Sequence, residues 1–219
     1  MKQLALKLPQ RGGKRKGAGR KRTAPRPKVS HKAREQFERA TPVLVTLRMA
    51  TGVWNLRSRR CFSAVEQCFT AARERFGLRI IEFSVLGNHI HLVVETESRE
   101  ALSRGMQGLS VRIAKALNRV MQRHGSVFDD HYHSCVLRTP TQLVNAIAYV
   151  VGNHERHYGP SHGVDPYSSL ACERPRVLAI PTTWLLRVGW RRARVSSPWV
   201  QGWLSAWSHA QTERVLAGA

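Results

Sequence analysis

Apolar residues in the middle of the chain recur with two alternating periods. A period of two residues is typical of a half-buried strand, and a period of about 3.6 residues is typical of a helix with one buried face. The predicted elements are strands at residues 43–49, 78–86 and 89–96, helices at residues 58–76, 99–123 and 140–157, and an extended run that reaches Leu137. Gly87-Asn88 suits a tight reversal between the second and third strands. The order predicts an α+β fold, a split βαβ arrangement with an antiparallel sheet and an appended helix.

Two histidines, His89 and His91, stand on either side of Ile90 at the start of the third predicted strand. Side chains two residues apart on a strand project to the same face, so the two imidazoles stand side by side and can share a metal ion. A histidine pair on a half-buried strand is more often a hydrogen-bonded structural pair. A metal site therefore requires a third group from another part of the chain.

The last predicted helix offers such a group. Tyr149 and Asn153 are four residues apart and therefore lie on one face of this helix, whose start is marked by a capping box at Thr139. If that face meets the histidine strand, Asn153 can be the third ligand and Tyr149 can reach the group that the metal polarises. His154 and His157 compete with Asn153 for the ligand role, and the helical phase favours Asn153.

Residues 87–95 and 149–153 resemble the two signatures of the HUH single-tyrosine transposases, most closely those of the REP-associated tyrosine transposase branch. The resemblance covers roughly residues 41–157 and implies a ferredoxin-like fold. It also implies that His89, His91 and Asn153 hold a divalent metal ion, Mg²⁺ or Mn²⁺, and that Tyr149 is the catalytic nucleophile. Members of the branch often continue from the amide into Pro-Val, whereas this chain reads His154-Glu155-Arg156, which changes the expected shape of the helix end.

The activity that the resemblance implies is metal-dependent strand transfer on DNA. Tyr149 attacks a phosphodiester of single-stranded or hairpin DNA, such as a palindromic repeat, and leaves a 5′-phosphotyrosine and a free 3′-hydroxyl. A later hydroxyl can rejoin the strands without nucleotide hydrolysis. Two other functions stay open: a non-catalytic, domesticated nucleic-acid-binding protein on the same fold, and a replication-initiator-like nicking endonuclease. Relatives include monomers and homodimers.

Charge independently indicates a polyanionic partner. The 36 Lys and Arg against 14 Asp and Glu give a formal net charge of +22. The first 34 residues hold 13 of these cations and no acid, which predicts a flexible arm that lies on phosphates. The expected DNA contacts are Lys14, Arg15, Lys16, Arg20, Lys21 and Arg22 in the arm and Arg104, Arg112, Lys115, Arg119, Arg138 and Arg156 beyond it.

Composition predicts three regions: a basic arm at residues 1–37, a catalytic domain at residues 38–158 and an extension at residues 159–219 that is rich in Trp and Arg. Interleaved Trp and Arg can stack on unpaired bases. More often such tryptophans pack an accessory element onto the main domain, and packing is the favoured interpretation here.

The sequence offers one alternative metal site and three alternative nucleophiles. The alternating residues His131, His133 and Cys135 would suit zinc, but a fourth ligand is not obvious and we favour polar groups lining the sheet. Other tyrosines could be the nucleophile, but they lie on an extended run or beside Gly and Pro; these are Tyr132, Tyr158 and Tyr167.

The four cysteines form no Cys-x-x-Cys pair, which predicts free thiols and no zinc finger. No run approaches the 18 apolar residues of a membrane span, and residues 1–10 lack the apolar core of a secretory signal. We therefore expect a bacterial cytoplasmic, nucleoid-associated protein with no membrane partner.

Overall fold

The computed structural model of the protein describes residues 35–37, 39–159, 163–171 and 177–217, with side chains as far as Glu213. The predicted arm lies almost wholly outside these residues. So do six of the expected DNA contacts, Lys14, Arg15, Lys16, Arg20, Lys21 and Arg22. Their role in DNA binding stays a prediction, as does the division into three regions.

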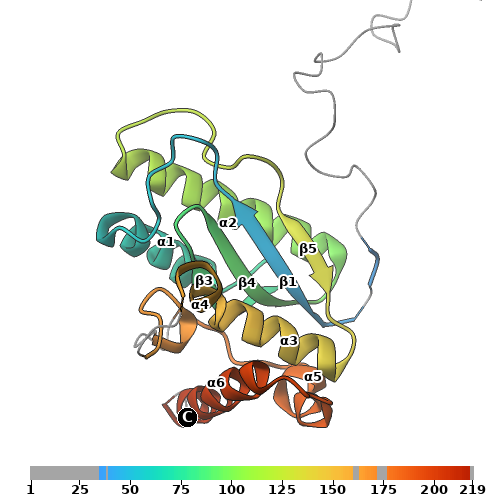
Figure 1. The fold of residues 1–219 in the computed structure, drawn as a ribbon. Coiled ribbons are helices and arrows are strands. Elements are labelled where there is room, and N and C mark those ends of the chain that lie inside the picture. Colours follow the sequence, from blue (N-terminus) through green and yellow to red (C-terminus); the bar gives the residue numbers. More distant parts are fainter. Residues whose placement is uncertain (1–34, 38, 160–162, 172–176, 218–219) are drawn as a thin grey trace, which may run out of the picture. The chain divides into compact units, whose positions relative to one another are not determined.

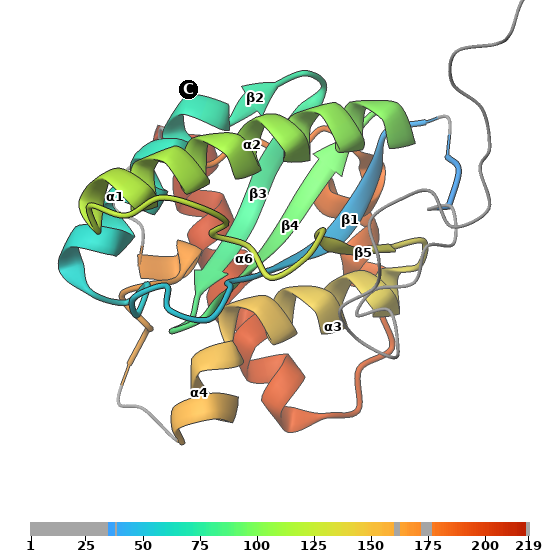
Figure 2. The ribbon, with the colours of Figure 1, turned by 90° about the horizontal axis from the view of Figure 1, so that it is seen from above.

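Five antiparallel strands form one sheet in the order β2-β3-β4-β1-β5 (Figures 1 and 2). Their bounds are Thr41–Arg48 for β1, Glu74–Arg75 for β2, Leu78–Val85 for β3, His89–Thr96 for β4 and His133–Val136 for β5. The other four strands, apart from the short edge strand β2, follow the order β3-β4-β1-β5, which is that of a split βαβ fold. The backbone amide of Leu86 donates to the carbonyl of His89 at 2.9 Å across the predicted reversal at Gly87-Asn88. The predicted ferredoxin-like fold is confirmed.

Helices α1 (Arg59–Ala72) and α2 (Arg99–Val120) pack against each other on one face of the sheet (Figure 2). Each begins after a serine, Ser58 or Ser98, whose hydroxyl accepts a hydrogen bond from the backbone amide three residues on. Alternate strand residues are buried beneath the helices, among them Val43, Val45, Leu47, Phe83, Ile90 and Leu92. This face is the larger apolar core.

The opposite face of the sheet is covered by α3 (Pro140–Val151), α5 (Trp184–Arg187) and α6 (Pro198–Ala217) (Figure 1). Ile81 and Val93 of the sheet are buried against these helices. Because successive strand residues point to opposite faces, the odd-numbered residues of β4 share this face with Val93. The sheet therefore presents the two histidines of β4 on the side where α3 lies.

Four tryptophans of the C-terminal segment pack on this second face, so the packing interpretation is confirmed for them. Trp207 is fully buried, and Trp190, Trp199 and Trp203 are partly buried. Trp184 differs, with 52% of its surface exposed. Helix α6 was not among the predicted elements because its apolar residues are spread around the helix rather than gathered on one face. No helix within the described ranges, α6 included, is long and apolar enough to cross a bilayer.

A buried carboxylate on β3 ties α6 to the sheet. Glu82 is fully buried and accepts hydrogen bonds from the indole nitrogen of Trp207 at 2.7 Å and from Nε2 of Gln211 at 3.0 Å. The hydroxyl of Ser169 is a third donor. These donors lie 87 to 129 residues further along the chain, so Glu82 joins parts of the fold that are remote in sequence.

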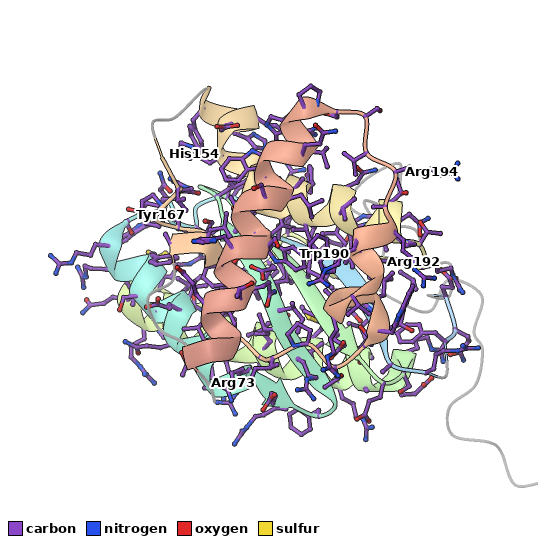
Figure 3. The ribbon with its side chains drawn as sticks, turned by 90° about the horizontal axis from the view of Figure 1, so that it is seen from below. Arg73, His154, Tyr167, Trp190, Arg192 and Arg194 are labelled. Atoms are coloured by element: carbon purple, nitrogen blue, oxygen red, sulfur yellow. The ribbon has the colours of Figure 1, made fainter. Side chains whose placement is uncertain are left out.

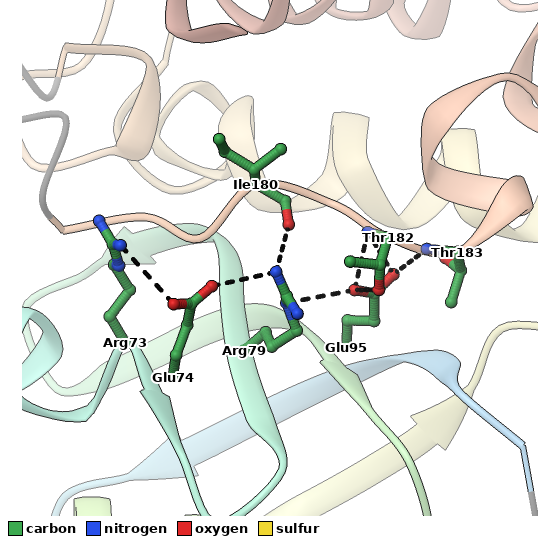
Figure 4. Close-up of polar contacts among 7 residues, drawn as sticks. All are labelled: Arg73, Glu74, Arg79, Glu95, Ile180, Thr182 and Thr183. Atoms are coloured by element: carbon green, nitrogen blue, oxygen red, sulfur yellow. Dashed lines mark hydrogen bonds and ion pairs between the residues drawn. The ribbon is translucent and has the colours of Figure 1, made fainter. Parts of the chain in front are cut away.

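A second buried carboxylate, Glu95 on β4, fastens the segment before α5 (Figure 4). Its oxygens accept from the backbone nitrogens of Thr182 and Thr183 at 2.9 and 2.6 Å and from the Thr182 hydroxyl at 2.6 Å. Arg79 lies 3.5 Å from the same carboxylate and donates to the carbonyl oxygen of Ile180 at 2.9 Å. The start of α5 is therefore held to the sheet by backbone as well as side-chain contacts.

The predicted helix at residues 140–157 is in fact two helices, α3 and α4 (Asn153–Tyr158), so its predicted continuity was wrong. The break falls at Gly152, where an added Cβ atom would lie 2.5 Å from Nε1 of Trp203 and 2.6 Å from Cζ2 of Trp199. Both indoles occupy the space that a larger side chain would need, so their packing requires glycine at this position. These tryptophans lie about 50 residues further along the chain, so no local pattern reveals the contact.

The predicted helix at residues 58–76 is also shorter in the structure. Helix α1 ends at Ala72, and the chain turns through Phe76 and Gly77, which have positive φ angles of 58° and 73°. The turn returns β2 to pair with β3. Glycine adopts such angles readily, whereas Phe76 pays a steric cost there.

Candidate active site

The centre of the site is His91, which meets one neighbour at each ring nitrogen. Its Nδ1 lies 2.9 Å from the hydroxyl of Thr46, the residue directly opposite on β1. Its Nε2 lies 3.4 Å from the hydroxyl of Tyr149, in the last turn of α3. The rings of His91 and Tyr149 pack edge to face with centroids 4.9 Å apart. The sheet and α3 therefore bring the predicted nucleophile to the predicted ligand.

His89 lies beside His91, as the strand spacing predicts, with ring centroids 4.8 Å apart. Burial lowers the pKa of His89 to about 4, helped by the nearby charges of His157 and Arg48. Burial also lowers the pKa of His91 to about 3, helped by His89 and His157. Both imidazoles are therefore neutral at pH 7, the form in which a ring nitrogen can bind a metal.

Asn153, the predicted third ligand, is the first residue of α4 and is fully buried. Neither atom of its amide group has a hydrogen-bond partner among the described residues. Asn153 lies four residues after Tyr149, which contacts His91, and four before His157, whose ring is 5.3 Å from that of His89. Burying an amide group without a hydrogen-bond partner costs free energy, and a bound metal ion would supply the missing partner of the Asn153 oxygen.

The donor set fits a divalent cation. Two neutral imidazoles and an amide oxygen are ligands that Mn²⁺ accepts, and Mg²⁺ accepts the oxygen more readily than the nitrogens. Within the described residues no three His, Cys, Asp or Glu come together as a metal site. That finding contradicts the zinc alternative at His131, His133 and Cys135, all three of which are exposed. A site at the β4 histidines consequently needs the amide.

Two arginines flank the site. The guanidinium carbon of Arg156 lies 5.6 Å from the centre of the Tyr149 ring and 4.7 Å from that of Trp199. Arg48 is exposed and pairs with His89 across the β1–β4 ladder. Arg156 was predicted from the sequence as a DNA contact, whereas Arg48 and Thr46 were not predicted as site residues. The strand register, which places both opposite the histidines, is the signal that would have found them.

The structure does not bring the α2 cations to this site. Arg104, Arg112, Lys115 and Arg119 belong to α2, which covers the other face of the sheet. Arg138 precedes α3, at the opposite end of that helix from Tyr149, and forms an ion pair with Glu35. Contacts of these five cations with DNA stay predictions and would lie away from the tyrosine.

The alternative tyrosines are placed differently from Tyr149. Tyr132 packs against the core of the α1–α2 face. Tyr167 packs edge-on against Phe62, and Tyr158 is 56% exposed and stacks on His154. Among these tyrosines, Tyr149 alone contacts the β4 histidines.

Comparison with protein families places this site in a known context. The family model described as “Transposase IS200 like” matches residues 55–153, which include both histidines, the tyrosine and the amide. Residues 55–153 are therefore similar to the IS200-like transposases. The matched segment ends at Asn153, so Arg156, His157 and the C-terminal helices lie beyond it.

Two solved structures also match part of this chain. A REP-associated tyrosine transposase bound to a REP hairpin is 12% identical, with 60% of this chain and 76% of that chain covered and a TM-score of 0.49. A protein described as a transposase of Deinococcus radiodurans is 10% identical, with 53% and 90% covered and a TM-score of 0.39. A comparison with curated proteins found no match.

Proposed function

We propose that the protein cleaves and rejoins single-stranded or hairpin DNA, with Tyr149 as the nucleophile and a 5′-phosphotyrosine as the intermediate. The match of residues 55–153 to the IS200-like transposases makes DNA cleavage the expected class of reaction. The observation that carries the proposal is the approach of the Tyr149 hydroxyl to Nε2 of His91 at 3.4 Å, beside a second neutral histidine. The +22 net charge supports DNA as the partner.

In the proposed step the hydroxyl oxygen of Tyr149 forms a bond to the phosphorus of the scissile phosphodiester. The bond from phosphorus to the 3′ oxygen breaks, and the proton lost by the phenol is taken up by the departing 3′ oxygen, so that a free 3′-hydroxyl results. Rejoining is the same step in reverse, with another 3′-hydroxyl as the attacking group. Arg156, over the tyrosine ring, and Arg48, beside His89, are placed to hold phosphate oxygens.

The residues that would hold a divalent cation are His89, His91 and Asn153. When bound, Mg²⁺ or Mn²⁺ supplies Lewis-acid polarisation of the scissile phosphate. Thr46 fixes the orientation of His91: when Nδ1–H donates to the Thr46 hydroxyl, the lone pair of Nε2 is directed toward Tyr149. This tautomer keeps Nε2 available as a ligand.

The test is to incubate the protein with labelled single-stranded hairpin oligonucleotides and Mn²⁺, then to look for a complex that survives denaturation. We expect a covalent band that is absent when a chelator is added before the DNA. His91→Ala should reduce this band to background while the far-ultraviolet circular dichroism spectrum stays that of the parent. A band of equal yield in chelator would remove the metal from the mechanism.

Thr46→Val is expected to weaken Mn²⁺ binding about 10- to 100-fold, because valine has the shape of threonine but cannot orient the imidazole of His91. Isothermal titration calorimetry measures this without DNA or turnover. Thr46→Ser keeps the hydroxyl and is the matched control, with near-parent affinity expected. Equal affinities for the valine and serine variants would contradict the orienting role.

A further inference from the structure

A hollow lies away from Tyr149, at the other end of α3. It has a volume of about 740 Å³, within the range of ligand-binding pockets. Its lining comes from the chain just before and at the start of β1, from the end of β5, and from the start of α5; it includes Phe37, Arg39, Pro42, Arg138 and Trp184. None of the expected catalytic residues takes part in it. Arg138 lies just before α3, and the nine residues from Pro140 to Tyr149 along this helix correspond to roughly 14 Å.

Trp184 gives this hollow an exposed aromatic wall. The indole is 52% exposed although every other described tryptophan of the C-terminal segment is at least partly buried. Its ring lies on the backbone of Gly189, where an added Cβ atom would be 2.5 Å from Cζ3 of the indole. The preceding Thr182 and Thr183 are fastened to Glu95 (Figure 4). The ring is therefore held in a fixed place with a large surface open to solvent.

The charge around this ring is positive. Arg39 and Arg138 line the hollow and are exposed, and the guanidinium carbon of Arg192 lies 5.3 Å from the centre of the Trp184 ring. Arg138 pairs with the exposed Glu35, whereas Arg39 and Arg192 form no ion pair with a described residue. Figure 3 shows Arg192 and Arg194 together at the outer edge of this C-terminal segment. A polyanion complements this arrangement, and an acidic peptide would not use the aromatic wall.

We propose that this hollow is a second binding site for single-stranded DNA, in which an unpaired base stacks on Trp184 and phosphates lie against Arg39, Arg138 and Arg192. Aromatic rings with adjacent arginines are the usual platform for unpaired bases. The inference deepens the proposed function, since a strand that occupies both places would span the length of α3. At a rise of about 3.4 Å per nucleotide for stacked bases, roughly five nucleotides cover that length.

The site is tested by fluorescence anisotropy with a labelled 20-nucleotide single strand in chelator, in a Tyr149→Phe background that cannot form an adduct. Trp184→Ala should weaken binding at least about fivefold, and Trp184→Phe should weaken it less, since phenylalanine still stacks. The matched control is Trp54→Ala, because Trp54 is 50% exposed in the loop between β1 and α1. Its affinity should equal that of the parent.

The arginines are tested by salt dependence. Arg39→Gln and Arg138→Gln should each lower the slope of log affinity against log salt by roughly 0.7, the value for one lost phosphate contact on a single strand. Arg60→Gln, at an exposed position of α1 on the other face of the sheet, should leave the slope unchanged. A thermal melt of each variant verifies folding, and Gly189→Ala, which displaces the indole, should reproduce the Trp184→Ala loss.

Equal affinities for Trp184→Ala and Trp54→Ala, or a parent that does not bind single strands, would overturn the inference. The two proposals fail independently because they are measured separately. Trp184-dependent binding without any covalent band would keep this site and reject the nucleophile. A covalent band with no effect of the Trp184 substitution on binding would keep the nucleophile and reject this site.

Discussion

A Tyr149→Phe variant is expected to bind single-stranded hairpin DNA as the parent does and to form no covalent complex with it. The substitution removes one hydroxyl oxygen, the atom that lies 3.4 Å from Nε2 of His91. The aromatic ring remains, so its packing against the His91 ring and under Arg156 is kept. The yield of the denaturation-resistant band should fall to that of a reaction without protein, while the anisotropy of labelled DNA is unchanged.

The matched control for this experiment is Tyr158→Phe. Tyr158 is 56% exposed on α4, two turns of helix beyond Tyr149, and stacks on His154 rather than on the β4 histidines. Its variant should give the covalent band in full yield. A band of undiminished yield from Tyr149→Phe, or its loss in Tyr158→Phe alone, would assign the chemistry to another tyrosine.

Glu82→Ala is expected to lower the free energy of unfolding by about 3 kcal/mol or more. The carboxylate is fully buried and receives hydrogen bonds from Trp207, Gln211 and Ser169, each worth about 1 kcal/mol. Without it, the indole nitrogen of the fully buried Trp207 loses its acceptor, which adds a desolvation cost. For a domain of this size the melting temperature should fall by roughly 6 to 12 °C.

The measurement is a urea titration followed by circular dichroism, with Glu97→Ala as the control. Glu97 is exposed just beyond β4, and its replacement should change the unfolding free energy by less than about 0.5 kcal/mol. Equal stability of the Glu82 and Glu97 variants would show that α6 does not depend on the buried carboxylate.

The central fold could be predicted from the sequence because its elements are encoded locally. The histidine strand, the reversal at Gly87-Asn88 and the capped start of α3 at Thr139 each depend on residues a few positions apart. The packing of the indoles of Trp199 and Trp203 on Gly152 could not be predicted in this way, because both tryptophans lie about 50 residues further along the chain. No local period encodes such contacts between remote segments.

Part of the candidate site is also encoded locally. Strand spacing predicts that His89 lies beside His91, and the two ring centroids are 4.8 Å apart. Helix spacing predicts a shared face for Tyr149 and Asn153, but the structure divides them between α3 and α4. Thr46 was missed because its role follows from the register of β1 on β4, and Thr46 lies 45 positions before His91 in the sequence. The cations of α2 were chosen for their outward phase on the helix, but phase does not reveal which face of the sheet a helix covers.

The most direct test of the catalytic proposal is peptide mass spectrometry of the protein after reaction with a short hairpin oligonucleotide and Mn²⁺. Digestion with protease and nuclease leaves a nucleotide on the residue that attacked the phosphate. We expect the added mass on Tyr149, and we expect it to disappear when the metal is chelated first. A nucleotide found on Tyr132, Tyr158, Tyr167 or a serine, with Tyr149 unmodified, would contradict the role of Tyr149 as the nucleophile.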